Sequence, residues 1–195
     1  MTTKNSKNEG IKIVEPITEQ DFLDSIELVR KTLFWEKGLL NEFKSLSSGE
    51  LLIAKDKNKI VGVLSQRRPG KIFTDWPEEY FDLENIKSSK EDIGYIAIIA
   101  VDKKSQGKGV GKKMIASALK LQEEFGSKAI AVHVSQNSPG GASEKLFRSF
   151  GFEPVKLYEK PWEEISKEKG LEGFVCAFCG NPCVCDELEM IKYLK

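Results

Sequence analysis

The sequence predicts a mixed α/β domain of the α+β type, with a central mixed sheet flanked by helices and a small cysteine-rich metal knuckle. Three observations support this prediction. An apolar stretch at residues 95–101 precedes a glycine-rich turn at 106–111 and a segment with helical periodicity. Short alternating stretches before and after it have the pattern of strands. All four cysteines lie between Cys176 and Cys185.

The composition is that of a folded protein with no overall charge to attract nucleic acid or a membrane. The chain has 195 residues, of which 40% are apolar, and 30 basic residues balance 30 acidic ones. No apolar run approaches the ~20 residues that cross a bilayer, and the polar first ten residues contain no secretory signal. We therefore expect a cytoplasmic protein without a membrane partner, with a disordered tail at 1–10 and one domain at 11–195.

The first half of the chain predicts a strand, a pair of helices and a hairpin. Thr18, with Asp21 three positions later, predicts a helix start, and a second short helix is expected over 36–44. The helix after Thr18 has its apolar residues on one face, at Phe22, Ile26, Val29 and Leu33. The alternating segments that predict strands are residues 11–14, 51–54 and 60–64.

The second half predicts further helices and strands, with one insertion. The segment after the glycine turn has an apolar stripe made of Val110, Met114, Ala118, Leu121 and Phe125. Another helix is expected around 146–150. Strands are expected at 129–134, 152–158 and 188–194. The insertion, residues 160–185, separates the last two strands and contains all four cysteines.

The turn at 106–111 has the features of a phosphate-binding loop. Its glycines let the backbone approach a ligand, and the first N–H groups of the following helix have no partner within the helix. Two common phosphate motifs fail on spacing. A P-loop requires Ser or Thr where Lys113 stands, and a dinucleotide fingerprint requires its third glycine where Lys112 stands.

The spacing Gln-x-x-Gly-x-Gly, as Gln106, Gly109 and Gly111, resembles the [RQ]-x-x-G-x-[GA] turn of the GNAT superfamily of acyl-CoA N-acyltransferases. The segment 146–152, LFRSFGF, is similar to the family's "LYeklGF" stretch. The resemblance covers 11–159 and 187–195. It implies acetyl-CoA as co-substrate, held by Ile99, Ala100, Val101, Gln106, Gly107, Lys108, Gly109, Val110, Gly111, Lys112 and Phe147. The alternative is a surface turn that binds nothing.

The resemblance implies transfer of an acetyl group from acetyl-CoA to a primary amine. In the family, a backbone N–H on the strand before the turn polarises the thioester carbonyl. In this chain the resemblance assigns that N–H to Ile99, Ala100 or Val101. In many members a bulge frees the N–H, and a bulge cannot be recognised from the sequence. The family's tyrosine in the "LYeklGF" stretch is Phe147 here, so its acid role does not carry over. The candidates for proton transfer are Glu91, Asp92, Tyr95 and Tyr158, with Tyr193 and His133 as further alternatives.

Residues 68–92 form a long connection rich in charge and aromatic residues. Connections of this length are usually functional or disordered, and the aromatic residues favour an ordered segment. It is either a wall of the acceptor pocket or a cover over the sheet.

The cysteines follow the pattern C-x2-C-x3-C-x-C, at Cys176, Cys179, Cys183 and Cys185. Four thiolates close a tetrahedral zinc site and leave no ligand position for substrate, so we expect a structural zinc, with Trp162 packing the insertion on the domain. The alternatives are an iron–sulfur cluster and a redox disulfide pair. The neighbouring glutamates argue against a nucleic-acid knuckle.

Two other functions remain open on the sequence. The missing tyrosine and the unassigned base fit a non-catalytic acyl-CoA sensor, and the knuckle fits a metal-dependent interaction protein. The sequence does not identify the acceptor amine. It is compatible with a homodimer and sets no oligomeric state.

Overall fold

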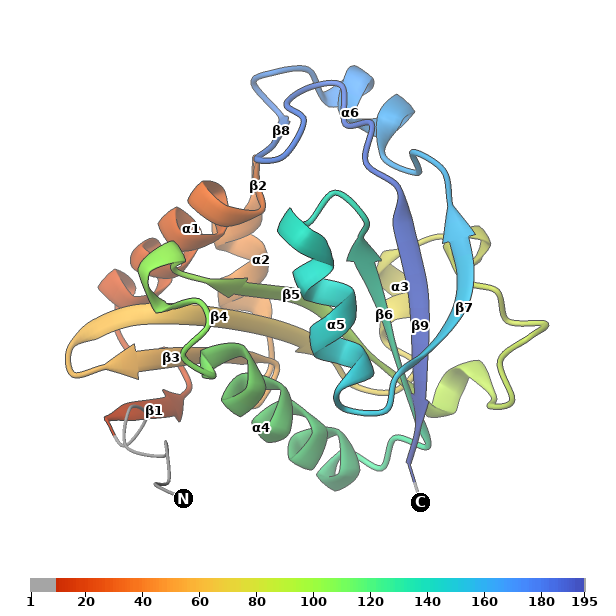
Figure 1. Ribbon diagram of the computed structural model, residues 1–195, viewed down its shortest axis with the longest axis horizontal. Coiled ribbons are helices and arrows are strands. Elements are labelled where there is room, and N and C mark those ends of the chain that lie inside the picture. Colours follow the sequence, from red (N-terminus) through yellow and green to blue (C-terminus); the bar gives the residue numbers. More distant parts are fainter. Residues whose placement is uncertain (1–9, 195) are drawn as a thin grey trace.

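A computed structural model describes residues 10–194. Its main sheet has seven strands in the order β1-β3-β4-β5-β6-β9-β7, and the only parallel neighbours among them are β5 and β6. The strands are β1 (Ile11–Val14), β3 (Leu51–Asp56), β4 (Lys59–Arg67), β5 (Ile93–Val101), β6 (Ala129–Ser135), β7 (Glu153–Tyr158) and β9 (Glu187–Tyr193). This mixed sheet confirms the predicted class (Figure 1). The predicted tail lies outside the described residues, apart from Gly10.

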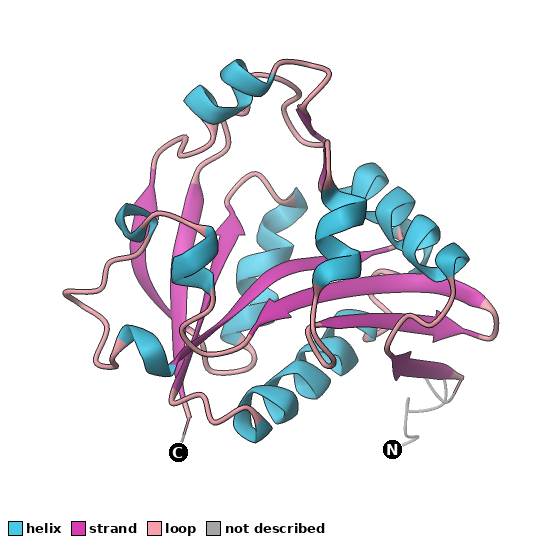
Figure 2. Ribbon diagram, turned by 180° about the vertical axis from the view of Figure 1, so that it is seen from behind, coloured by secondary structure: helices cyan, strands magenta, loops and turns pink. Residues whose placement is uncertain are grey.

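The helices cover both faces of the sheet. They are α1 (Glu19–Thr32), α2 (Leu39–Ser45), α3 (Ile72–Asp75), α4 (Val110–Glu124), α5 (Ala142–Arg148) and α6 (Glu163–Lys169). α1 and α2 pack on one face, and α4 and α5 pack on the other (Figures 1 and 2). Within residues 10–194, no helix has both the length and the apolar character needed to cross a membrane.

Local sequence signals account for the start of α1. The Thr18 hydroxyl accepts a hydrogen bond from the Asp21 N–H at 3.1 Å, and the Asp21 carboxylate accepts one from the Thr18 N–H at 3.3 Å. This capping box was predicted from the spacing of the two residues and satisfies N–H groups that the helix itself leaves unpaired.

The central feature of the sheet is a bulge in β5 at Ala97. β4 pairs Ser65 with Ile98 and Gln66 with Ile96, so Ala97 has no opposite residue. An extra residue shifts the alternation of side chains. Accordingly, Ile96 packs in the α4–α5 core, whereas Ile98, two residues later, packs in the α1–α2 core on the opposite face.

β5 and β6 separate at the same position. Their pairing runs from Ile93 opposite Ala129 to Ile96 opposite Val132 and then stops. Beyond Ile96, the edge of β5 that faces β6 is not paired with it, and the two strands diverge as a V (Figure 1). The glycine-rich turn follows β5 at the wide end of this opening.

The cysteine insertion crosses over this opening. Its strand β8 (Phe174–Cys176) pairs with β2 (Phe34–Glu36), which follows α1, in a separate two-stranded sheet. The rings of Phe34 and Phe174 stack with centroids 5.7 Å apart. The insertion thus joins the β7–β9 side of the molecule to the α1 side (Figure 1). The sequence did not predict β2, β8 or their pairing.

Candidate active site

The glycine-rich turn is held by its own hydrogen bonds. The Asp102 carbonyl accepts from the N–H groups of Ser105 and Gln106, and the Gln106 side chain donates to the Val101 carbonyl at 3.1 Å. Gly107 and Gly109 have φ of 72° and 80°, which favour glycine. A Cβ at Gly107 would meet no atom within 4 Å, so the backbone there faces open space.

Gly109 is the N-cap of α4, and the N–H groups after it point out of the helix end. Gly111 has a different role, because a Cβ there would lie 3.0 Å from Leu146 Cδ2. The glycine therefore brings the start of α4 close to α5. The loop, the open backbone and the helix end together form a cradle suited to a phosphate.

A cavity of about 650 Å³ occupies the space where β5 and β6 separate. Residues 95–99 and 132–135 form its floor, and Phe147 from α5 lines it as well. Segment 68–92 contributes Trp76 and Tyr80, while its residues Phe81 and Ile86 are buried against the sheet. The segment therefore lines the cavity and also covers the sheet, and its role as a wall of the acceptor pocket remains a prediction.

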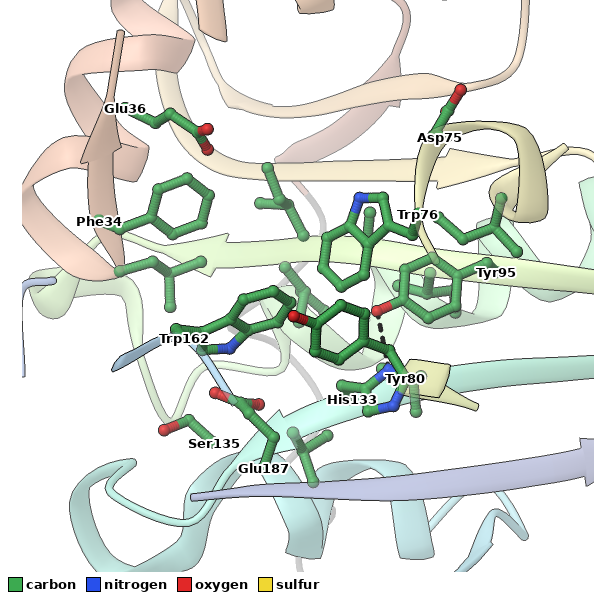
Figure 3. A pocket seen from close by; sticks show the side chains of 18 of the residues that line it. Phe34, Glu36, Asp75, Trp76, Tyr80, Tyr95, His133, Ser135, Trp162 and Glu187 are labelled. Carbon is green, nitrogen blue, oxygen red and sulfur yellow. Dashed lines mark hydrogen bonds between the residues drawn. The ribbon is translucent and has the colours of Figure 1, made fainter. Parts of the chain in front are cut away.

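Tyr95 and His133 are joined inside the cavity. The Tyr95 hydroxyl lies 3.0 Å from His133 Nδ1 (Figure 3). Burial raises the pKa of Tyr95 above its ordinary value, and the charges of Glu187 and Glu189 raise it further. Burial lowers the pKa of His133 to about 4. At neutral pH the tyrosine therefore keeps its proton and the histidine is uncharged.

The other predicted proton-transfer residues lie elsewhere. Glu91 and Asp92 belong to a short 3-10 turn before β5 and are not part of the cavity wall. Tyr158 lies behind His133, with ring centroids 5.5 Å apart, and its hydroxyl donates to Glu189 at 3.2 Å. Burial raises the pKa of Tyr158, and the charge of Glu189 raises it further.

Four aromatic side chains from separate parts of the chain meet in the cavity: Trp76, Tyr80, Tyr95 and Trp162 (Figure 3). Trp76 and Trp162 meet edge to face with centroids 4.8 Å apart, and Tyr80 stacks on Trp162 at 5.4 Å. Trp76 also lies 5.9 Å from Tyr95. The electron-rich faces of such rings attract cations.

The charges that line the cavity are mostly paired. The ion pairs are Arg67 with Glu42 and Asp75, Lys71 with Glu50, and Lys169 with Glu36. Glu187 lines the cavity below Trp162 and forms no ion pair within residues 10–194 (Figure 3). Burial raises the pKa of Glu187 to about 8, against the lowering effect of the Trp162 indole and the Ser135 hydroxyl.

The four cysteine sulfurs converge at the edge of the cavity. All four lie within 4.8 Å of one another, with Cys179 Sγ 3.3 Å from Cys185 Sγ and 3.7 Å from Cys183 Sγ. Tetrahedral Zn–S bonds of about 2.3 Å place sulfurs about 3.8 Å apart, close to these separations. Cys176 Sγ also accepts from the Phe178 N–H, and Cys179 Sγ from the Val184 N–H. These thiols fit a four-sulfur metal site.

Sequence reasoning did not assign Trp76, Tyr80 or Glu187 to the site. Trp76 and Tyr80 lie in a segment without periodicity, so their aromatic character is the only signal that the sequence gives for them. The signal for Glu187 was present in β9, where Glu187 and Glu189 alternate with Leu188 and Met190. Acidic residues on the buried face of a strand inside the sheet indicate a polar site.

The fold is shared with solved acetyltransferase structures. Ard1 from Thermoplasma volcanium superposes with a TM-score of 0.66 at 12% identity, over 95% of this chain and 99% of that chain. The ribosomal-protein-alanine N-acetyltransferase from Brucella melitensis superposes with a TM-score of 0.60 at 20% identity, over 94% and 99%. At these identities the likeness defines the fold alone.

The sequence comparison defines the family. Residues 17–152 match the sequence profile of the Acetyltransferase (GNAT) family, and the chain belongs to that family. GCN5-related N-acetyltransferase 4, chloroplastic, of Arabidopsis thaliana is 25% identical over 120 residues. This alignment spans 61% of the present chain and 38% of that relative.

Proposed function

We propose that the protein transfers an acetyl group from acetyl-CoA to a primary amine. The observation that supports this most is the opening of the sheet at Ala97, with the glycine cradle at one end and the aromatic cavity at the other. A long, narrow thioester with a phosphate-bearing end fits such a path. Family membership supports the same reaction.

Each part of acetyl-CoA has a proposed contact. The pyrophosphate binds the backbone N–H groups of residues 106–111 at the start of α4. The pantetheine arm lies along the edge of β5 beyond Ile96, which does not pair with β6. The acetyl carbonyl lies at the bulge, so the polarising N–H belongs to Ala97 or Ile98, just before the segment 99–101 that the sequence indicated.

In the reaction, the ammonium group first gives one proton to solvent, and the neutral amine nitrogen then attacks the thioester carbon. The proton that the nitrogen loses afterwards restores the acid that protonates the CoA sulfur. The oxyanion of the tetrahedral intermediate accepts a hydrogen bond from the backbone at the bulge. The C–S bond then breaks and the CoA sulfur takes up a proton. We assign that proton to the Tyr95 hydroxyl, two residues before Ala97, with His133 as the positioning residue that orients the hydroxyl. This assignment replaces the family's tyrosine, which is Phe147 here.

The proposed metal ion has a structural role and takes no part in the proposed acetyl transfer. Four convergent thiols and their N–H···S hydrogen bonds support a structural zinc bound by Cys176, Cys179, Cys183 and Cys185. Such a closed site offers no ligand position to substrate. A cytoplasmic location and a homodimer remain predictions.

The test is calorimetric titration of the full chain, loaded with metal, with acetyl-CoA, desulfo-CoA and ATP, followed by release of free CoA thiol with a panel of amines. We expect acetyl-CoA to bind more tightly than ATP, and thiol release to depend on an amine. Equal binding of ATP would mean that the turn is not a CoA cradle. Binding of acetyl-CoA without turnover on any amine would favour the sensor function instead.

A further inference from the structure

We infer that the cysteine insertion completes an aromatic and acidic receptor for a primary alkylammonium group, and that the bound metal holds this receptor in place. The inference rests on the proposed function, since the group it would bind is the acceptor amine. It assigns a substrate class and a role in substrate recognition to a segment in which the sequence predicts a structural zinc site.

The receptor is built from two sources that are distant in the sequence. Trp76 and Tyr80 come from the segment between β4 and β5, and Trp162 comes from the insertion. Tyr80 stacks on Trp162 with an interplanar angle of 24°, and Trp76 meets Trp162 at 78°. Trp162 therefore contacts both other rings, whose own centroids lie 6.2 Å apart.

The charge of the receptor favours a cation. The basic side chains in the cavity wall are already neutralised by carboxylates, and Arg67 is shared by two of them. Glu187 lies beneath Trp162 and has no cationic partner in the described part of the chain (Figure 3). An ammonium ion bound against the cavity-facing sides of the rings would gain the cation–π attraction and would hydrogen-bond to the Glu187 carboxyl group, whose ionised form the nearby cation would stabilise. A methylene stem would lie against the ring faces.

The place of the receptor fits the proposed reaction. Tyr95 belongs to the same ring cluster, through its 5.9 Å approach to Trp76, and lies two residues from the bulge. An amine held at the rings is thus next to the point where the acetyl carbonyl is proposed to lie. Binding near the reacting carbon lowers the entropic cost of bringing the two substrates together.

The position of Trp162 depends on the cysteine cluster. Trp162 packs against the buried Cys176, Cys183 and Cys185. Its carbonyl accepts from the Ser166 N–H at 2.9 Å, and the Ser166 hydroxyl accepts from the Cys183 N–H at 2.7 Å. Trp162 is therefore linked to the cysteine cluster both by direct packing and by hydrogen bonds through Ser166.

The insertion is also anchored to the opposite side of the cavity. The Ala177 N–H donates to the Leu33 carbonyl at 2.7 Å, and the Lys37 N–H donates to the Gly173 carbonyl at 2.9 Å. Four uncoordinated thiols have little affinity for one another, so the metal is what fixes the loop at 176–185. Loss of the metal would release Trp162 while leaving the glycine cradle of α4 untouched.

The experiment measures amine binding directly, without turnover. The full chain, loaded with metal, is titrated with n-pentylammonium and with 1-pentanol, which has the same stem and no charge. We expect the ammonium ion to bind at least about tenfold more tightly, a difference of about 1.4 kcal/mol. Equal binding of the alcohol would overturn the inference. Parallel titrations with 1,5-diaminopentane and with the peptide acetyl-Gly-Lys-Gly-amide distinguish a free amine from a lysine side chain.

Matched variants locate the site. Trp162→Leu and Glu187→Gln should each weaken n-pentylammonium binding at least about tenfold. The controls are Trp35→Leu, in β2 but outside the cavity wall, and Glu168→Gln on the exposed side of α6, and both should leave binding unchanged. Unchanged affinity in Trp162→Leu would exclude the insertion from the receptor. Trp162→Phe retains a ring and should keep most of the affinity.

The metal link is tested with Cys179→Ser. We expect it to lose n-pentylammonium binding at least as strongly as Trp162→Leu while binding acetyl-CoA with wild-type affinity. Retained amine binding in this variant would overturn the role of the metal. Acetyl-CoA binding is read separately in every variant, so failure of the amine site and failure of the proposed acetyl transfer give different results.

Discussion

The Tyr95 hydroxyl and His133 Nδ1, 3.0 Å apart, join β5 and β6 at the point where the two strands separate. The last paired residues are Ile96 and Val132, so this hydrogen bond lies at the apex of the opening. It holds the hydroxyl against His133, and Tyr95 itself lies two residues before the bulge at Ala97. The geometry of the proposed proton donor is therefore tied to the feature that opens the sheet.

Replacing Tyr95 with phenylalanine should reduce kcat by about 10²-fold and change the KM for acetyl-CoA little, because the proton donor is lost while the ring remains. Steady-state thiol release measures both constants. The control is Tyr193→Phe, which removes a hydroxyl that accepts only from the Lys87 N–H at 2.9 Å, outside the cavity. A Tyr95 variant with wild-type kcat would show that the leaving thiolate needs no acid from this residue.

Replacing Gly109 with alanine should weaken acetyl-CoA binding about tenfold or more, because Gly109 is the N-cap of α4 and a side chain there would disturb the backbone proposed to bind the pyrophosphate. The positive φ of 80° also costs stability, about 1 kcal/mol. Gly126→Ala is the matched control: its φ is 83°, a Cβ there would meet no atom within 4 Å, and it lies at the other end of α4. Calorimetry and urea unfolding should give similar losses of stability in both variants. Only Gly109→Ala should lose affinity, and equal affinities would exclude the cradle.

The stability of the protein should fall as the pH drops from about 6.5 to about 4, in part because of His133. Its pKa is about 4 in the folded protein and about 6.5 in the unfolded chain, so the unfolded chain binds more protons in this window. His133→Gln, which cannot titrate, should therefore show a shallower pH dependence, by up to one proton. Urea unfolding at pH 7 and pH 4.5 measures the difference. Since His133 is the only histidine, identical slopes would mean that it is not buried in the neutral form.

Removing one thiolate should remove the metal. Elemental analysis of protein purified without chelator should find about one zinc per chain in the wild type and far less in Cys183→Ser. The variant should also have a lower Tm, because the folding of residues 160–185 depends on the metal. Chelator should lower the Tm of the wild type and leave that of the variant unchanged. Wild-type protein with far less than one metal per chain would contradict the zinc proposal.

The sequence determined the elements that depend on neighbouring residues. The capping of α1 by Thr18 and Asp21, the glycine turn and the apolar stripe of α4 are local patterns, so they could be predicted without a fold. The spacing of Gln106, Gly109 and Gly111 identified the family, because that chemistry is confined to one turn and one helix end. The four cysteines lie within ten residues, so their convergence was predictable as well.

Only the tertiary structure decided the residues that meet across the cavity. The bulge at Ala97 arises from pairing with β4, and no residue type in β5 indicates its position. Glu91 and Asp92 adjoin β5 in the sequence but lie at its other end, away from the cavity, because a nine-residue strand separates them from the turn. Trp162 and Tyr80 stack although 82 positions separate them, because the insertion crosses back over the sheet. Contacts of this kind depend on strand order and on the path of the insertion, which no local pattern specifies.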